Sequence, residues 1–174
     1  MDHEEYSRAA GYWKEKDKSA KKADRADVYA AATDFLGRNK TCALATGHGS
    51  DVRCTPVDYS FDGGAFYIFT EGGEKFSNLE KNQNVSISVF EGGGTFGKLH
   101  SVQVMGTAEF VEPFCAEYEH IAEIRRIPVN GLKKLKYPMY LLKVVPCEII
   151  LLDSSFKEKG LDSRQVWRRD EDEK

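Results

Sequence analysis

Apolar positions in the first part of the chain recur at helical spacing. Five of them form one stripe in the segment 24–38: Val28, Ala31, Ala32, Phe35 and Leu36. Residues three and four apart share a face of a helix, so this segment is expected to be an amphipathic helix that ends near Gly37 to Asn39. A more charged helix carrying Tyr12 and Trp13 is expected before it, over residues 6–18.

From Lys40 onward apolar and polar positions alternate with the period of a strand. Six strands are expected, over residues 42–46, 52–61, 65–70, 85–90, 101–112 and 140–152. The sequence Asp62-Gly63-Gly64 predicts a tight hairpin between the second strand and the third. Pro146 has no backbone N–H to donate, so it predicts an edge or a bulge in the last strand.

Two further helical segments interrupt the strands. Residues 74–82 are expected to form a helix of about two turns, with Phe76 and Leu79 on its inner face, and residues 113–136 are largely helical in pattern. Six strands with short hairpins and these helices predict a closed or nearly closed antiparallel barrel. An open α+β sandwich fits the same pattern.

The chain of 174 residues is long enough for one domain with a substantial core. We divide it into an N-terminal helical segment (1–39), a barrel domain (40–156) and a charged C-terminal tail (157–174) in which Trp167 is the one aromatic residue.

Composition narrows the classes of function. The formal net charge of -3 gives no global field that would attract nucleic acid or an anionic membrane. No apolar run approaches the length of a membrane span, and the N-terminus lacks the apolar region of a secretory signal, so a cytoplasmic protein is expected. The four cysteines form no CxxC pair and the four histidines show no metal-ligand spacing.

The junction between the third strand and the helix that follows it is the first candidate site. Two glycines, Gly72 and Gly73, let the backbone approach a ligand, and Lys75 adds a positive charge where a helix begins. This arrangement predicts a phosphate site, provided that Glu71 and Glu74 point outward. The alternative is an ordinary turn with a solvated lysine.

Arg53 is the second candidate, because an arginine within an apolar strand must pair, extend to solvent or face a ligand. Thr55 adds a hydroxyl on the same face, and Pro56 interrupts the ladder beside them. The alternative is a surface arginine paired with Asp51 or Asp58.

Other motifs predict no chemistry. Residues Gly92 to Leu99 nearly spell a nucleotide P-loop, but Leu99 replaces the required Ser or Thr and a strand follows, so a P-loop is rejected. The basic clusters lack interleaved aromatic residues, and no Ser, His and Asp set indicates nucleophilic catalysis.

Taken in order, three segments resemble the pyridoxamine 5'-phosphate oxidase-like family of FMN-binding split barrels. The segments lie within residues 39–113 and read CALATGHGSDVRCTPVDYSFDGGAFYIFT, EGGEKFSNLEKNQNVSISVFE and SVQVMGTAEFVEP. The resemblance implies a six-stranded antiparallel split β-barrel with N-terminal helices, forming a homodimer with FMN between the subunits.

The resemblance also implies a set of residues near the cofactor. They are Arg53, Cys54, Thr55, Pro56, Phe69, Thr70, Lys75, Phe76, Gln103 and Trp167. Arg53 and Lys75 would lie at the phosphate, and Gln103 would reach the ring from the partner subunit. Where the family often has Ser and Arg before the lysine, this chain has Gly73 and Glu74, so backbone N–H groups would carry more of the phosphate binding.

The favoured function is an FMN-dependent oxidoreductase for a small molecule, in which the flavin performs hydride or electron transfer. Pyridoxamine phosphate oxidation is not carried over, because the segment 163–167 is only a loose analogue of the family's C-terminal closing segment. The alternatives are a non-catalytic flavin- or haem-binding dimeric module, with His48 or His100 as the axial haem ligand, and a cofactor-free dimeric interaction domain. A deazaflavin in place of FMN is left open.

Overall fold

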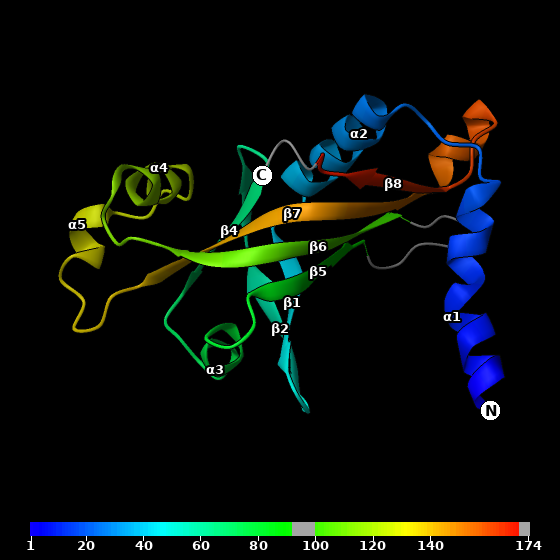
Figure 1. Ribbon diagram of the computed structural model, residues 1–174. Helices are drawn as coiled ribbons and strands as arrows, with labels where there is room; N and C mark the ends of the chain where they lie inside the picture. Colours follow the sequence, from blue (N-terminus) through cyan, green and yellow to red (C-terminus); the bar gives the residue numbers. More distant parts are fainter. Residues whose placement is uncertain (92–99, 171–174) are drawn as a thin grey trace.

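The computed structural model describes residues 1–91 and 100–170, and the rejected P-loop segment lies outside them (Figure 1). The helices are α1 (His3–Lys18), α2 (Arg25–Arg38), α3 (Lys75–Leu79), α4 (Ala116–Ile124) and α5 (Val129–Leu132), with a 3-10 helix at Ser154–Lys159. The strands are β1 (Thr41–His48), β2 (Asp51–Asp58), β3 (Ser60–Asp62), β4 (Ala65–Thr70), β5 (Asn84–Phe90), β6 (His100–Val111), β7 (Tyr140–Asp153) and β8 (Arg164–Arg168).

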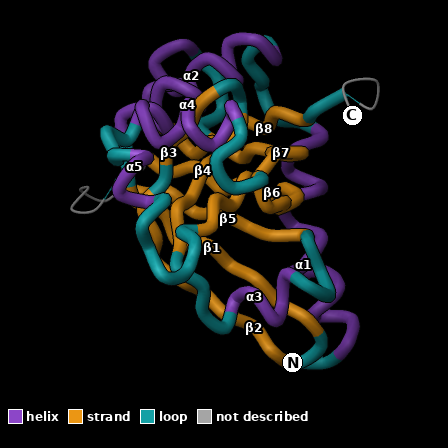
Figure 2. The backbone as a smooth tube through the Cα atoms, turned by 90° about the vertical axis from the view of Figure 1, so that its left-hand side faces the viewer, coloured by secondary structure: helices purple, strands orange, loops and turns teal. Residues whose placement is uncertain are grey.

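The strands form one antiparallel sheet in the order β2-β1-β5-β6-β7-β4-β3, and β8 pairs with β7. The two ends of this order, β2 and β3, are successive segments of the chain that meet at Tyr59. The sheet therefore curls around its own core, which confirms the expected antiparallel barrel with N-terminal helices (Figure 2). Eight strands are described instead of six, because the second expected strand divides at Tyr59 and the tail adds β8.

The main core lies on the inner face of the sheet and is covered by α2. The apolar stripe predicted for this helix is confirmed, with Val28, Ala32, Phe35 and Leu36 buried in it. The Tyr59 side chain is fully buried and its hydroxyl donates to the Leu36 carbonyl at 2.8 Å. This bond ties the point where β2 becomes β3 to the end of α2.

A second, smaller core lies on the outer face of β4 and β7. There α4 contributes Tyr118 and Ile121, which pack with Tyr67 and Leu141 of the sheet. Both faces of β4 are buried over residues 65–68 as a result, which is why its sequence, AFYIFT, is hydrophobic up to Phe69.

Two local predictions from glycine and proline are confirmed. Gly63 and Gly64 form the two-residue loop between β3 and β4, with φ angles of 54° and 80° that suit a tight hairpin. The β6–β7 register shifts next to Gly106, opposite Pro146. On its other edge β7 pairs with β4 before Pro146 and with β8 after it, so the missing N–H falls where the neighbouring strand changes.

Part of the expected charged tail joins the sheet. Residues 164–168 form β8, in which Gln165 and Trp167 are buried between exposed or half-buried neighbours. The Trp167 ring packs on Tyr29 of α2, with ring centroids 4.8 Å apart. This strand is not predicted from the sequence because charged residues flank it, and its alternation of buried and exposed positions covers only five residues.

Helix α1 stands at the opposite end of the sheet from α4 and α5 (Figure 1) and buries none of its residues. A hydrogen-bonded ion pair at 2.6 Å links Arg164 Nη1 to Asp17 near its C-terminal end. No helix among the described residues is long and apolar enough to cross a membrane.

Candidate functional site

The turn that leaves β4 depends on glycine. Gly72 and Gly73 have φ angles of 134° and 105°, in a region that side chains rarely adopt. The Thr70 hydroxyl accepts a hydrogen bond from the Gly72 N–H at 3.3 Å and holds the start of the turn. Helix α3 has five residues, fewer than the two turns expected. Because so short a helix has a small dipole, any attraction for an anion must come from side-chain charge.

Lys75 is the first residue of α3 and only 8% of it is exposed. Its ammonium donates to the Gly72 carbonyl and lies 5.6 Å from the centre of the Phe76 ring. Within the described parts of the chain it forms no ion pair. Burial lowers the pKa of Lys75 below its ordinary value, because removing water disfavours the charged form. This side chain is a buried cation that still has donors to offer.

Arg53 reaches the same turn from β2. Its guanidinium forms an ion pair with Glu74, and its Nε lies 3.5 Å from Asp51 Oδ1. That Nε is buried, yet its N–H makes no hydrogen bond. The structure thus brings the two sequence-predicted candidates together. It also corrects the requirement that Glu74 point away from the site, because this carboxylate pairs with Arg53.

Two buried polar residues that sequence reasoning missed attach α3 to the sheet. The Asn78 amide points toward the Thr46 hydroxyl at 3.5 Å, and both residues are almost fully buried. The Asn82 amide donates to the Gly47 carbonyl at 2.7 Å. A signal was present, because Thr46 continues the buried face of β1 that Cys42 and Leu44 begin.

The other β2 residues divide between two faces. Thr55 is half-buried on the inner face with Arg53, as predicted from their spacing. Cys54 and Pro56 are exposed on the outer face. Only Thr55 therefore shares a face with Arg53, which limits any contact from Cys54 and Pro56 at this site to their backbone.

The aromatic residues flanking the turn also separate. The Phe69 ring packs against Tyr118, 5.2 Å between centroids, on the face of β4 opposite Thr70. Phe76 packs on Phe110 and Tyr140 at 4.8 and 5.2 Å. It forms one wall of a groove of about 530 Å³ between α3 and the ends of β6 and β7.

Gln103 and Trp167 do not join this site within one chain. Gln103 is exposed on the outer face of β6, in register with Ser88 and Ile150. Trp167 is a core residue, so its side chain presents little surface to a ligand. Strand β8 lies far from α3 in both views (Figures 1 and 2). Within one chain, Trp167 packs between β8 and α2 and lies away from the Lys75 turn.

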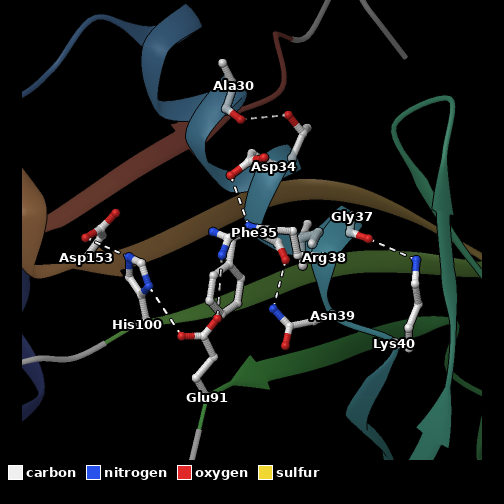
Figure 3. A network of polar contacts seen from close by, with 12 residues as sticks. Ala30, Asp34, Phe35, Gly37, Arg38, Asn39, Lys40, Glu91, His100 and Asp153 are labelled. Atoms are coloured by element: carbon white, nitrogen blue, oxygen red, sulfur yellow. Dashed lines mark hydrogen bonds and ion pairs between the residues drawn. The ribbon is translucent and has the colours of Figure 1, made fainter. Parts of the chain in front are cut away.

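A second cluster of charges surrounds His100, at the start of β6 (Figure 3). The His100 Nε2 lies 2.8 Å from Asp153 and its Nδ1 lies 3.6 Å from Glu91. Arg38 completes the cluster, 3.9 Å from Glu91 and 3.2 Å from Asp34. The Nε2 atom of His100 is close enough to Asp153 for a hydrogen bond, whereas Nδ1 is at ion-pair distance from Glu91. His48, the other candidate ligand, is exposed at the end of β1.

Asp153 is the best-bonded member of this second cluster. Burial alone would raise its pKa, but hydrogen bonds from Ser155 and His100 outweigh burial and lower the pKa of Asp153. The Ser155 backbone N–H donates to it at 2.8 Å. No group of residues suited to hold a metal ion occurs in the described ranges.

Comparison with known families identifies the class of protein. A model of the pyridoxamine 5'-phosphate oxidase family matches residues 29–130, which is more than half of the 174 residues. The chain therefore belongs to the pyridoxamine 5'-phosphate oxidase family. A search of curated protein sequences found no match.

Solved structures share the fold. A FAD-binding protein from Mesorhizobium loti is 20% identical, with a TM-score of 0.58 over 70% of this chain and 89% of that one. The haem storage protein HutZ from Vibrio cholerae is 18% identical, with a TM-score of 0.55 over 67% and 88%. General Stress Protein 26 from Bacillus anthracis is 18% identical, with a TM-score of 0.53 over 79% and 95%. At these identities the likeness concerns the split-barrel fold.

Proposed function

We propose that the chain is an FMN-binding oxidoreductase that acts as a homodimer on a small molecule. One observation carries the proposal. Lys75 is buried without an ion pair among the described residues, and the Arg53 guanidinium at the same turn keeps a buried N–H without a hydrogen bond. Unused donors on the Lys75 ammonium, beside a second cation at Arg53, suit a phosphate group, which accepts several charge-assisted hydrogen bonds.

The residues at the turn fit the phosphate end of FMN. Lys75 and Arg53 would hold the phosphate, and the turn at Gly72 and Gly73 has no side chains to keep a ligand away from the backbone. The Thr55 and Thr70 hydroxyls lie on the adjoining inner faces of β2 and β4. When bound, FMN would supply hydride or electron transfer, while the protein binds and orients it.

The outer face of the sheet supports the homodimer. Two rows of paired residues cross β2, β1, β5 and β6 on this face: Pro56, Ala43, Ser88 and Gln103, and Cys54, Ala45, Ser86 and Met105. These side chains are short or unbranched and none is charged, so a second copy can approach closely. Gln103 faces away from the Lys75 turn of its own chain and would serve the site of a partner. A monomer in sedimentation at micromolar concentration would contradict this assembly.

The spectrum of the purified protein separates flavin from haem. A bound flavin gives two broad absorbance bands, whereas a bound haem gives a sharp Soret band. Release and identification of the chromophore then distinguish FMN, FAD and a deazaflavin. A protein that is colourless and gains no thermal stability with FMN would instead be the cofactor-free dimer. Oxidation or reduction of the bound flavin by candidate small molecules then tests catalysis.

The sharpest binding test uses Lys75→Ala with two ligands. Loss of one charge-assisted phosphate contact is worth about 1.5–3 kcal/mol, so the affinity for FMN should fall about tenfold or more. Riboflavin has the same ring without the phosphate, and its affinity should change little. Fluorescence titration measures both dissociation constants. Equal losses for the two ligands, or no loss for either, would remove Lys75 from the site.

A further inference from the structure

Glu74 introduces a negative charge into the proposed phosphate site. It lies between the two glycines and Lys75, and its carboxylate forms an ion pair with Arg53 Nη1. Asp51 approaches the same guanidinium at 3.5 Å. Two cations, Arg53 and Lys75, therefore stand against two carboxylates, and the local formal charge is about zero while Glu74 remains in contact.

Among the residues that the structure describes, Arg53 alone holds the Glu74 carboxylate in this position. Its side chain is 73% exposed. It occupies the N-cap position of α3 but makes no capping hydrogen bond. The side chain can therefore turn into solvent without breaking a helix cap or leaving a cavity. Its pairing with Arg53 is reversible at small cost.

A phosphate and the Glu74 carboxylate would use the same donors. The N–H groups of the Arg53 guanidinium can bind either a carboxylate or a phosphate. A phosphomonoester carries a charge between about -1.5 and -2 at neutral pH. A carboxylate left in place would repel that charge in a partly desolvated site. Binding of the phosphate therefore requires Glu74 to leave the guanidinium.

On the basis of the proposed function, we propose that Glu74 is a built-in competitor that occupies Arg53 until a phosphate-bearing ligand displaces it. Its charge sets how strongly the site prefers FMN over riboflavin. The residue thus acts as a specificity determinant at the phosphate end of the site, opposing the attraction of Lys75 and Arg53.

The test is Glu74→Gln, which keeps the shape of the side chain and removes its charge. FMN should bind about fivefold more tightly to this variant at low ionic strength, with a smaller gain at high salt, because salt screens exposed charges. Riboflavin affinity should not change. The matched control is Glu71→Gln, since Glu71 lies in the same turn, is exposed and has no ion pair within the described residues.

A double variant separates competition from long-range repulsion. If Glu74 competes for Arg53, the gain from Glu74→Gln should shrink when Arg53 is already alanine. An equal gain in both backgrounds, an equal gain from Glu71→Gln, or unchanged or weaker FMN binding by Glu74→Gln would each overturn the competition. If in those cases the wild-type chain still prefers FMN to riboflavin, the proposed FMN-binding function stands and only the role of Glu74 is rejected. A wild-type chain that binds no flavin would overturn both.

Discussion

Two clusters of charged side chains lie in different parts of this barrel, and they are built differently. Around His100 the side chains contact one another in a continuous chain, from Asp34 through Arg38, Glu91 and His100 to Asp153 (Figure 3). At the turn before α3, Lys75 is more deeply buried, yet its one hydrogen-bond acceptor in the described part of the chain is a backbone carbonyl.

The difference separates a structural role from a binding role. Side chains that are paired with one another within the fold hold segments together and have few hydrogen-bonding groups left for a ligand. A buried cation without a counter-ion costs stability until a ligand supplies the anion. We therefore propose a structural role for the His100 cluster and a binding role for the Lys75 turn.

The largest expected effect is on the structural cluster. Asp153→Ala removes the carboxylate that accepts from the Ser155 N–H and from His100, and hydrogen bonds to a charged group contribute about 1.5–3 kcal/mol. Urea unfolding should show a loss of about 2 kcal/mol, with FMN affinity unchanged. Asp34→Ala is the control, because its exposed ion pair with Arg38 should be worth less than about 1 kcal/mol. Equal losses from the two variants would break the comparison.

Alanine substitution of one arginine from each cluster tests whether the two clusters have different roles. Arg53→Ala should weaken FMN binding about fivefold, a modest loss because the side chain is 39% exposed, and should leave the fold intact. Arg38→Ala removes a guanidinium from the structural cluster and should lower stability slightly without affecting FMN. Isothermal titration and thermal unfolding of both variants measure the two quantities. Unchanged FMN affinity in Arg53→Ala would return Arg53 to the role of a surface residue.

The smallest expected effect is a gain in stability. Lys75→Met removes a desolvated ammonium from the ligand-free protein and should stabilise it by about 1 kcal/mol or less, while reducing the stabilisation that FMN provides. The gain should depend on pH. In the folded protein the pKa of Lys75 lies below its ordinary value of 10.5. At pH values between the folded pKa and 10.5 the unfolded chain binds more protons than the folded chain, so wild-type stability rises with pH there.

The difference between Lys75→Met and the wild-type chain should therefore be largest near neutral pH and should shrink as pH rises toward 10.5. Chemical unfolding at several pH values measures it. A variant that is less stable than the wild-type chain at neutral pH would show that the Lys75 side chain is satisfied within the fold.

The sequence by itself determined the features that depend on local spacing and backbone chemistry. The apolar stripe of α2 follows from helical periodicity, and the hairpin at Gly63 and Gly64 follows from the φ angles that only glycine adopts readily. The turn at Gly72 and Gly73 and the irregularity opposite Pro146 have the same origin. Each of these predictions needs only residues that are neighbours in the chain.

Only the tertiary structure decided which charges are paired. Glu74 meets Arg53 across two segments of the chain, Asp153 meets His100 in the same way, and Lys75 is left without a carboxylate within the described residues. The strand containing Trp167 was likewise not recognisable in the charged tail, because it forms by pairing with the distant strand β7. Burial and ion pairing depend on contacts between distant segments, and local patterns carry no information about which distant group will arrive.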